Sequence, residues 1–278
     1  MPEPASHVID SVKHPAIRAA RSLSRPDGRS KQGEYLIEGE GAIQQALDRD
    51  AGLVCAFVAS ADELTRRLSL EGIPCYAVTS GLLFKIIGTS YDTAIRAVGV
   101  VRQRAVAVED LSADPGTIIV AGESVQDPRN VGVLIRTSDA AGVSALILSE
   151  DSGDPFSRAS VRSSTGSILR LPTGRLQDLL STLTRLRERR FRVISSSAHA
   201  DRPYWDAELT GPTVLVLGNE SRGVSDDVRA LVDEEIRIPM LGTAHSLNVA
   251  VAAGILLYEC VRQRRRTEAG DWRLGARG

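Results

Sequence analysis

The stretch Thr117-Ile-Ile-Val-Ala121 decides the fold of the second half of the chain, because it is a continuous apolar run. Such a run is typical of a strand that is buried on both faces of a parallel sheet. Further short apolar runs follow it, and segments with helical periodicity lie between several of them. The pattern predicts a doubly wound α/β domain with a parallel sheet. The further strands are expected at Ala145 to Leu148, Phe191 to Ile194, Thr213 to Leu217 and Ile236 to Ile238, and the helices after Asn130, from Leu176 to Arg189 and from Ser246 to Arg262.

The first hundred residues predict a smaller α/β domain. Tyr35-Leu-Ile-Glu-Gly39 has the pattern of a strand that opens into a helix, and short strands are expected at Val54 to Val58, Cys75 to Val78 and Ala97 to Val101. Alternation of strands and helices favours a small parallel or mixed sheet. We therefore expect an N-terminal domain at residues 1–105, a linker at 106–116, the larger domain at 117–266 and a flexible tail at 267–278.

Charge is distributed unevenly along the chain. The formal net charge is −1, yet the segment from Lys13 to Gly33 holds six positive side chains against one negative, and six arginines from residue 262 onward oppose two acids. Such clusters are expected where a protein contacts phosphates, although they also occur on solvated helix faces. Arg21, Arg25 and Lys31 are our candidates for phosphate contact. Aromatic residues make up only 4% of the chain, which argues against a single-strand binder built on rows of stacking side chains.

The cysteines and the apolar runs exclude several other classes of protein. Cys55, Cys75 and Cys260 are far apart, with no Cys-x-x-Cys motif and no paired histidine, so neither a disulfide framework nor a metal site is indicated. No apolar run reaches the ~18 residues that a membrane-spanning helix needs. The first residues also lack the pattern of a signal peptide. The sequence predicts a cytoplasmic protein with no membrane segment and no metal.

Polar clusters stand at the ends of the apolar runs, which is where ligand sites collect in α/β proteins. The first is Asn130-Val-Gly-Val-Leu-Ile-Arg136-Thr, in which Asn130 is expected to cap a helix and free amides at the helix start suit an anion. The second is Gly218-Asn-Glu-Ser-Arg-Gly223, a loop bounded by glycines with Glu220 inside it. A capped helix with a solvated arginine would also explain the first cluster, and a plain turn would explain the second.

A third cluster joins Ile238-Pro-Met240 to Ser246-Leu-Asn-Val249. Ser246 is expected to cap the final helix, whereas Asn248 stands among apolar residues and needs a hydrogen-bond partner, which a purely structural amide would also find. Neither a dinucleotide fingerprint nor a serine-hydrolase elbow accounts for these clusters. Gly-x-Gly-x-x-Gly is absent from the first, and Ser221 lacks the Gly-x-Ser-x-Gly context.

Taken together, the three clusters resemble the motifs of the SpoU (TrmH-like) family of RNA ribose 2′-O-methyltransferases, in order and in approximate spacing. The similarity covers nearly the whole chain, with residues 117 to 262 resembling the catalytic domain and residues 11 to 101 resembling an RNA-binding module of the ribosomal-RNA type. The resemblance implies a deep trefoil knot in the C-terminal domain, a homodimer, and S-adenosylmethionine as cofactor. It assigns catalytic roles to Asn130, Arg136, Glu220, Ser246 and Asn248. It assigns cofactor binding to Gly218, Ile238, Met240 and Leu247.

The function expected from this resemblance is methylation of a ribose 2′-hydroxyl in RNA, most of all 23S ribosomal RNA, as a housekeeping modification or for antibiotic resistance. A tRNA methyltransferase and a non-catalytic RNA-binding assembly protein are the alternatives. The family gives Arg136 the role of base, but a guanidinium stays protonated at working pH and is equally suited to position a phosphate. On either assignment Arg21, Arg25 and Lys31 would contact the RNA.

Overall fold

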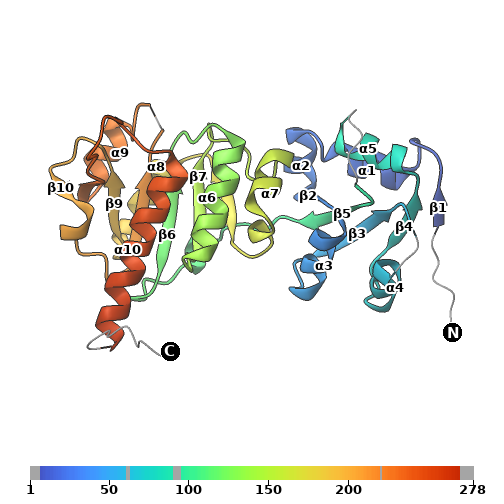
Figure 1. The fold of residues 1–278 in the computed structure, drawn as a ribbon, viewed down its shortest axis with the longest axis horizontal. Helices are drawn as coiled ribbons and strands as arrows, with labels where there is room; N and C mark the ends of the chain where they lie inside the picture. Colours follow the sequence, from blue (N-terminus) through green and yellow to red (C-terminus); the bar gives the residue numbers. More distant parts are fainter. Residues whose placement is uncertain (1–6, 61–62, 90–94, 220, 270–278) are drawn as a thin grey trace. The chain divides into compact units, whose positions relative to one another are not determined.

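The computed structural model describes residues 7–60, 63–89, 95–219 and 221–269 (Figure 1). The chain divides into two compact units. The N-terminal unit holds residues 1–104 together with 156–170, and the C-terminal unit holds residues 105–155 and 171–278. The sequence analysis assigned residues 156–170 to the larger domain, whereas the structure packs this segment with the N-terminal unit.

The N-terminal unit is built on a mixed sheet. Within the described ranges the sheet has five strands in the order β1-β4-β3-β5-β2, and β5 runs antiparallel to both of its neighbours while the remaining pairs are parallel. The strands are β1 (His7–Ile9), β2 (Glu34–Glu38), β3 (Leu53–Val58), β4 (Cys75–Val78) and β5 (Ala97–Arg102). The helices are α1 (Pro15–Ser22), α2 (Pro26–Gln32), α3 (Glu40–Asp48), α4 (Glu63–Leu70), α5 (Ser80–Ile87) and α7 (Arg158–Ser164), which is followed by the 3₁₀ turn η2 (Ser167–Leu169).

Apolar side chains fill both faces of this sheet. On one face α1 and α5 pack together over Phe57, which is fully buried and stacks on Tyr76. On the other face α3 lies so close to β5 that a Cβ at Gly99 would come within 3.1 Å of Ile43. This close packing holds α3 directly against β5.

The C-terminal unit confirms the predicted parallel α/β fold. Its described residues form a sheet of seven strands in the order β10-β12-β9-β11-β6-β7-β8, and every pair is parallel. The sequence analysis missed β8, because it expected a helix from Leu176 where the structure has an edge strand and a later helix. The strands are β6 (Ile118–Gly122), β7 (Ala145–Ser149), β8 (Thr173–Leu176), β9 (Arg192–Ser196), β10 (Arg202–Pro203), β11 (Thr213–Leu217) and β12 (Glu234–Arg237).

Helices cover both faces of this sheet (Figure 1). One face packs on α8 (Leu179–Glu188) and α9 (Asp226–Leu231), and the other faces α6 (Pro128–Ala140) and α10 (Val249–Ala269), which pack on each other. Because side chains alternate along a strand, continuous apolar strands supply both cores. None of the helices in the described ranges has the length and apolar character that a bilayer crossing requires.

The expected linker at 106–116 is not a free connection. It contains the 3₁₀ turn η1 (Val108–Asp110), and Val108 is buried in the core under α8, with Val106 and Leu111 packed beside it. The guanidinium of Arg189 donates hydrogen bonds to the carbonyl oxygens of Val108, Glu109 and Leu111. This segment is therefore part of the C-terminal unit.

Candidate functional site

A cavity of about 460 Å³ lies at the carboxyl ends of β9, β11 and β12 in the C-terminal unit. All four expected cofactor residues, Gly218, Ile238, Met240 and Leu247, line this cavity, and so does Ser246. The carboxyl edge of a parallel sheet is where α/β proteins bind ligands. The structure thus brings the second and third motifs together at one edge of the sheet.

The loop after β11 is shaped by Asn219. The backbone groups of Asn219 and Gly223 exchange hydrogen bonds of 3.0 and 2.8 Å, which closes the loop. The side-chain oxygen of Asn219 accepts from the backbone N–H groups of Ser221 and Arg222, and its amide nitrogen donates to the carbonyl oxygen of Ser124 at 3.0 Å. Asn219 therefore ties the loop to itself and to the end of β6. Glu220, the expected catalytic acid in this loop, lies outside the described residues.

Gly218 allows this closure because it has no side chain. A Cβ at Gly218 would lie 2.1 Å from the carbonyl carbon of Gly223 and 2.3 Å from the nitrogen of Val224, both of them backbone atoms. No side chain fits at that distance. The loop and the adjoining wall of the cavity therefore require glycine at this position.

The first motif contains the start of α6, where the expected cap was wrong. Asp127 is the N-cap: its carboxylate accepts from the backbone N–H of Arg129 at 2.8 Å, and Pro128 occupies the first helical position. Hydrogen bonds from the side chain and then the backbone of Arg129 lower the pKa of Asp127. Asn130 therefore lies inside the first turn, and its side chain is available for other contacts.

Asn130 contacts the third motif. The side-chain nitrogen of Asn248 donates to the side-chain oxygen of Asn130 at 3.0 Å, while the side-chain oxygen of Asn248 accepts from the backbone N–H of Ala250 at 2.9 Å. Asn248 thus caps α10, and the expected cap, Ser246, lies outside the helix. The partner that the amide of Asn248 needs is Asn130, so two candidate catalytic residues from distant motifs lie in contact.

Arg136 does not line the cavity. It is exposed on α6, one turn after Val133, which is 43% exposed. In the described part of the chain no carboxylate pairs with Arg136. The side chains of Arg136 and Val133 are three positions apart and both belong to the exposed surface of α6.

Several residues of the cavity were missed by the sequence analysis. His199 and His245 both line it, as do Ser196 and Arg229. Ser196 is the last residue of β9, and a polar residue at the end of an apolar strand is a signal in the sequence that could have predicted its place at the cavity. Ser196 and His199 lie outside the three motifs, whereas His245 stands directly before Ser246.

Of the expected RNA-binding residues, Arg21 and Arg25 line a groove of about 930 Å³ in the N-terminal unit, together with Arg18 and Lys85. Lys31 is exposed and does not line this groove. Arg29, from the same basic cluster, is only 5% exposed and donates to the carbonyl oxygen of Leu23 at 2.8 Å. Arg29 therefore stabilises the fold rather than presenting its charge to a ligand.

The C-terminal basic cluster also includes structural arginines. Arg264 donates to the carbonyl oxygens of Gly116, Leu209 and Gly211, and Arg262 pairs with Glu259 at 2.6 Å. The contacts of Arg264 hold the end of α10 against neighbouring loops, whereas the Arg262–Glu259 pair lies within the helix. Within the described ranges no cluster of three or more histidine, cysteine, aspartate or glutamate side chains is placed to hold a metal ion.

An all-parallel sheet with an amphipathic cavity at its carboxyl edge defines this protein as a ligand-binding α/β protein. The model of the SpoU rRNA Methylase family matches residues 117–258, which include every motif residue of the cavity. The chain belongs to this family of methyltransferases.

Relatives of known activity resemble the chain over nearly its whole length. The 23S rRNA (guanosine(2553)-2′-O)-methyltransferase RlmP of Bacillus subtilis is 32% identical, over 90% of this chain and 97% of its own. The 23S rRNA (uridine(2479)-2′-O)-methyltransferase of Streptomyces viridochromogenes is also 32% identical, over 87% of each chain. Among solved structures, the AdoMet-bound rRNA methyltransferase from Sinorhizobium meliloti superposes with a TM-score of 0.81 at 28% identity, covering 92% of this chain and 98% of that one.

Proposed function

We propose that this protein transfers a methyl group from S-adenosylmethionine to a ribose 2′-hydroxyl of 23S ribosomal RNA in the cytoplasm. The relatives from Bacillus subtilis and Streptomyces viridochromogenes are both named as 2′-O-methyltransferases of 23S rRNA. Both match the N-terminal part of the chain as well as the family domain. The observation that carries the proposal is the cavity at the edge of the sheet, because it gathers Gly218, Ile238, Met240 and Leu247.

The cavity fits the proposed cofactor in size and in chemistry. Its volume of about 460 Å³ lies in the range of small-molecule sites. Leu217, Ile238, Met240 and Leu247 give it an apolar wall suited to an adenine ring, and nearby hydroxyl, amide and guanidinium groups suit ribose and carboxylate. When bound, the cofactor supplies an activated methyl group, so the protein needs mainly to position the attacking oxygen.

We assign the catalytic roles around the contact between Asn130 and Asn248. Arg136 binds the phosphate beside the attacking hydroxyl, because a guanidinium remains protonated at all working pH values and offers two parallel N–H donors. Asn130 and Glu220 orient this arginine or the ribose. Ser246 and Asn248 hold the loop that borders the cofactor, as the cap that Asn248 forms on α10 supports.

We also propose that the protein is a homodimer that associates through α6 and α10. The two helices pack side by side and expose Val133, Val251 and Tyr258, which are 43%, 52% and 54% exposed. Large apolar side chains on neighbouring helices are typical of a protein interface. A partner on this face would lie next to Arg136 and would help to enclose the RNA.

The chain path in the C-terminal unit supports a deep trefoil knot. β12 pairs with β9, but α10, which follows β12, packs on α6. Because β11 lies between β9 and β6, the segment from 238 to 248 has to cross the carboxyl end of β11, where the loop closed by Asn219 stands. We infer that the chain passes through that region as a knot, an exception to the usual connection rules.

The N-terminal unit is proposed to bind the RNA. Exposed Arg21 and Arg25 line a basic groove there, and Lys31 adds an exposed charge on α2. Changing these three residues to glutamine should weaken RNA binding and flatten its dependence on salt, because fewer counterions are released, while the affinity for S-adenosylmethionine stays the same. Titrations of RNA at several salt concentrations test this expectation. Parallel slopes with equal affinities would remove the N-terminal cluster from the binding surface.

Methylation assays test the central proposal. The purified protein, incubated with labelled S-adenosylmethionine and 23S rRNA, should yield a labelled dinucleotide that survives alkaline hydrolysis, because the blocked 2′-hydroxyl cannot attack its phosphate. Label on a base would overturn the proposal. Transfer to tRNA instead of rRNA would establish the tRNA alternative, and absence of cofactor binding would establish a non-catalytic RNA-binding protein.

A further inference from the structure

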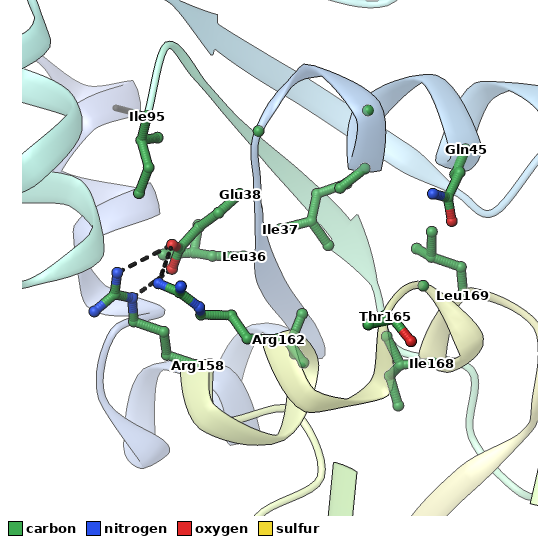
Figure 2. A pocket seen from close by; sticks show the side chains of 15 residues that line it. Leu36, Ile37, Glu38, Gln45, Ile95, Arg158, Arg162, Thr165, Ile168 and Leu169 are labelled. Carbon is green, nitrogen blue, oxygen red and sulfur yellow. Dashed lines mark hydrogen bonds and ion pairs between the residues drawn. The ribbon is translucent and has the colours of Figure 1, made fainter. Parts of the chain in front are cut away.

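A second cavity lies entirely within the N-terminal unit and shares no residue with the cofactor cavity. Its volume is about 610 Å³. One wall comes from the end of β2 and from α3, and the opposite wall comes from α7 and η2 (Figure 2). Figure 2 shows that Arg158 and Arg162 both turn toward Glu38, while Gln45 and Thr165 stand at the other end.

The two arginines are used differently. Arg158 is committed to Glu38, since its Nε and Nη2 atoms each donate to a carboxylate oxygen and the Nη2 contact is 3.0 Å long. Arg162 reaches the same carboxylate through Nη1 only, at 3.4 Å, and its side chain is 58% exposed. The side chain of Glu38 is 10% exposed, so one carboxylate faces two guanidinium groups. The group keeps one net positive charge, and the N–H donors of Arg162 are the accessible part of it.

The turn that borders the cavity has an unusual backbone. Thr165 has a φ of +47° and Gly166 a φ of +89°, both in the left-handed region. This conformation is costly for a β-branched residue, and strain of this kind collects at ligand sites. The turn also allows close packing, because a Cβ at Gly166 would lie 2.1 Å from the side-chain oxygen of Gln45. The turn and α3 together place the amide of Gln45 at the wall of the cavity.

We propose that this cavity binds one nucleotide of the RNA substrate away from the methylated ribose, with the phosphate on Arg162 and the base against the apolar wall. The wall contains Leu36, Ile95, Val161 and Leu169, which suit the face of a base. A guanidinium recognises a phosphate through paired N–H donors, and the amide of Gln45 offers both a donor and an acceptor to a base edge. This inference rests on the proposed RNA substrate and adds a second contact to it.

Arg162→Gln tests the proposal, because it removes the charge and breaks only the long contact with Glu38. We expect the Kd for 23S rRNA to rise about 5- to 10-fold and the salt slope to fall by about 0.7 to 0.9. The kcat at saturating RNA, the Kd for S-adenosylmethionine and the melting temperature should not change. Arg66→Gln is the matched control, since Arg66 is exposed on α4 and lines neither this cavity nor the basic groove.

Two further measurements separate the remaining explanations. Arg158→Gln should lower the melting temperature, because it removes the paired hydrogen bonds to the carboxylate of Glu38. An unchanged melting temperature would contradict the structural role given to Arg158.

Guanosine 5′-monophosphate and uridine 5′-monophosphate should bind wild type far more weakly than RNA. Tight binding of either mononucleotide would instead show a site for a free nucleotide.

Failure of this inference is distinguishable from failure of the proposed function. If wild type methylates 23S rRNA and Arg162→Gln behaves like Arg66→Gln, only the nucleotide site is refuted. If wild type neither binds nor methylates RNA, the proposed function falls first, and this site falls with it.

Discussion

Gly218→Ala should abolish tight cofactor binding while leaving most of the fold intact. The new methyl group would lie 2.1 Å from the carbonyl carbon of Gly223, 2.3 Å from the nitrogen of Val224 and 2.4 Å from the oxygen of Gly223. These are backbone atoms, so no side-chain rotation relieves the contact. The end of β11 and the far side of the loop have to move apart by about 1 Å.

The size of the effect follows from what that movement breaks. Overpacking against a fixed backbone costs about 1 to 3 kcal/mol. The hydrogen bonds between Asn219 and Gly223 are 3.0 and 2.8 Å long, and each one lost or weakened adds about 1 kcal/mol. If restoring the binding conformation of the loop costs about 3 kcal/mol, cofactor affinity falls by about 100-fold.

Calorimetric titration with S-adenosylmethionine measures this loss, and thermal unfolding measures the accompanying change in stability. Gly211→Ala is the matched control, because a Cβ at Gly211 meets nothing within 4 Å and the residue precedes the same strand. The control should bind the cofactor as wild type does. Wild-type affinity in Gly218→Ala would refute the argument that the loop closes against this glycine to form the cavity.

Three other predictions concern the motifs and the thiols. Arg136→Ala should abolish methyl transfer while the affinity for S-adenosylmethionine stays unchanged. Arg136→Lys should retain only part of the activity, because the paired N–H donors of the guanidinium are lost. Full activity of Arg136→Ala would show that Arg136 is only a solvated residue of the helix. Asn248→Ala should cost about 1 kcal/mol in unfolding measurements. Asn248→Ser should keep a capping oxygen but lose the amide that donates to Asn130, so equal activity of Asn248→Ser and wild type would exclude a role for that bond. Burial raises the pKa of Cys55 to about 12 and that of Cys260 to about 11, so both thiols should resist alkylation near pH 8. The free energy of unfolding should fall as pH rises from about 9 to 11, because only the thiols of the unfolded chain ionise there. Rapid alkylation of the folded protein would contradict this.

The parallel sheet was predictable because its central strands are apolar on both faces. β6, β7 and β11 are fully buried, so their sequences carry no other pattern. β8 was missed for the complementary reason. It lies at the edge of the sheet, only the first of its four residues is buried, and they include a glycine and an arginine. A half-exposed edge strand beside an arginine-rich helix has no distinct apolar run.

The helix caps show how local signals compete. Asp127 and Asn130 are both good capping residues, but Pro128 at the first helical position indicates Asp127. Likewise Ser246 and Asn248 both precede the apolar run of α10, and in the structure Asn248 caps the helix while its side-chain nitrogen donates to Asn130, which is 118 positions away. Sequence patterns gave the residues of these motifs, but only the fold decides which of them caps and which is available to a substrate.

Long-range contact also explains why the second cavity had no sequence signature. Glu38 pairs with Arg158 and Arg162 across 120 and 124 positions, and α7 reaches it from a segment that interrupts the C-terminal unit. A segment between two strands of the methyltransferase domain thus completes the unit proposed to bind RNA. Any substitution that unfolds this segment should therefore affect RNA affinity before cofactor affinity, because its side chains line the N-terminal cavity and none of them lines the cofactor cavity.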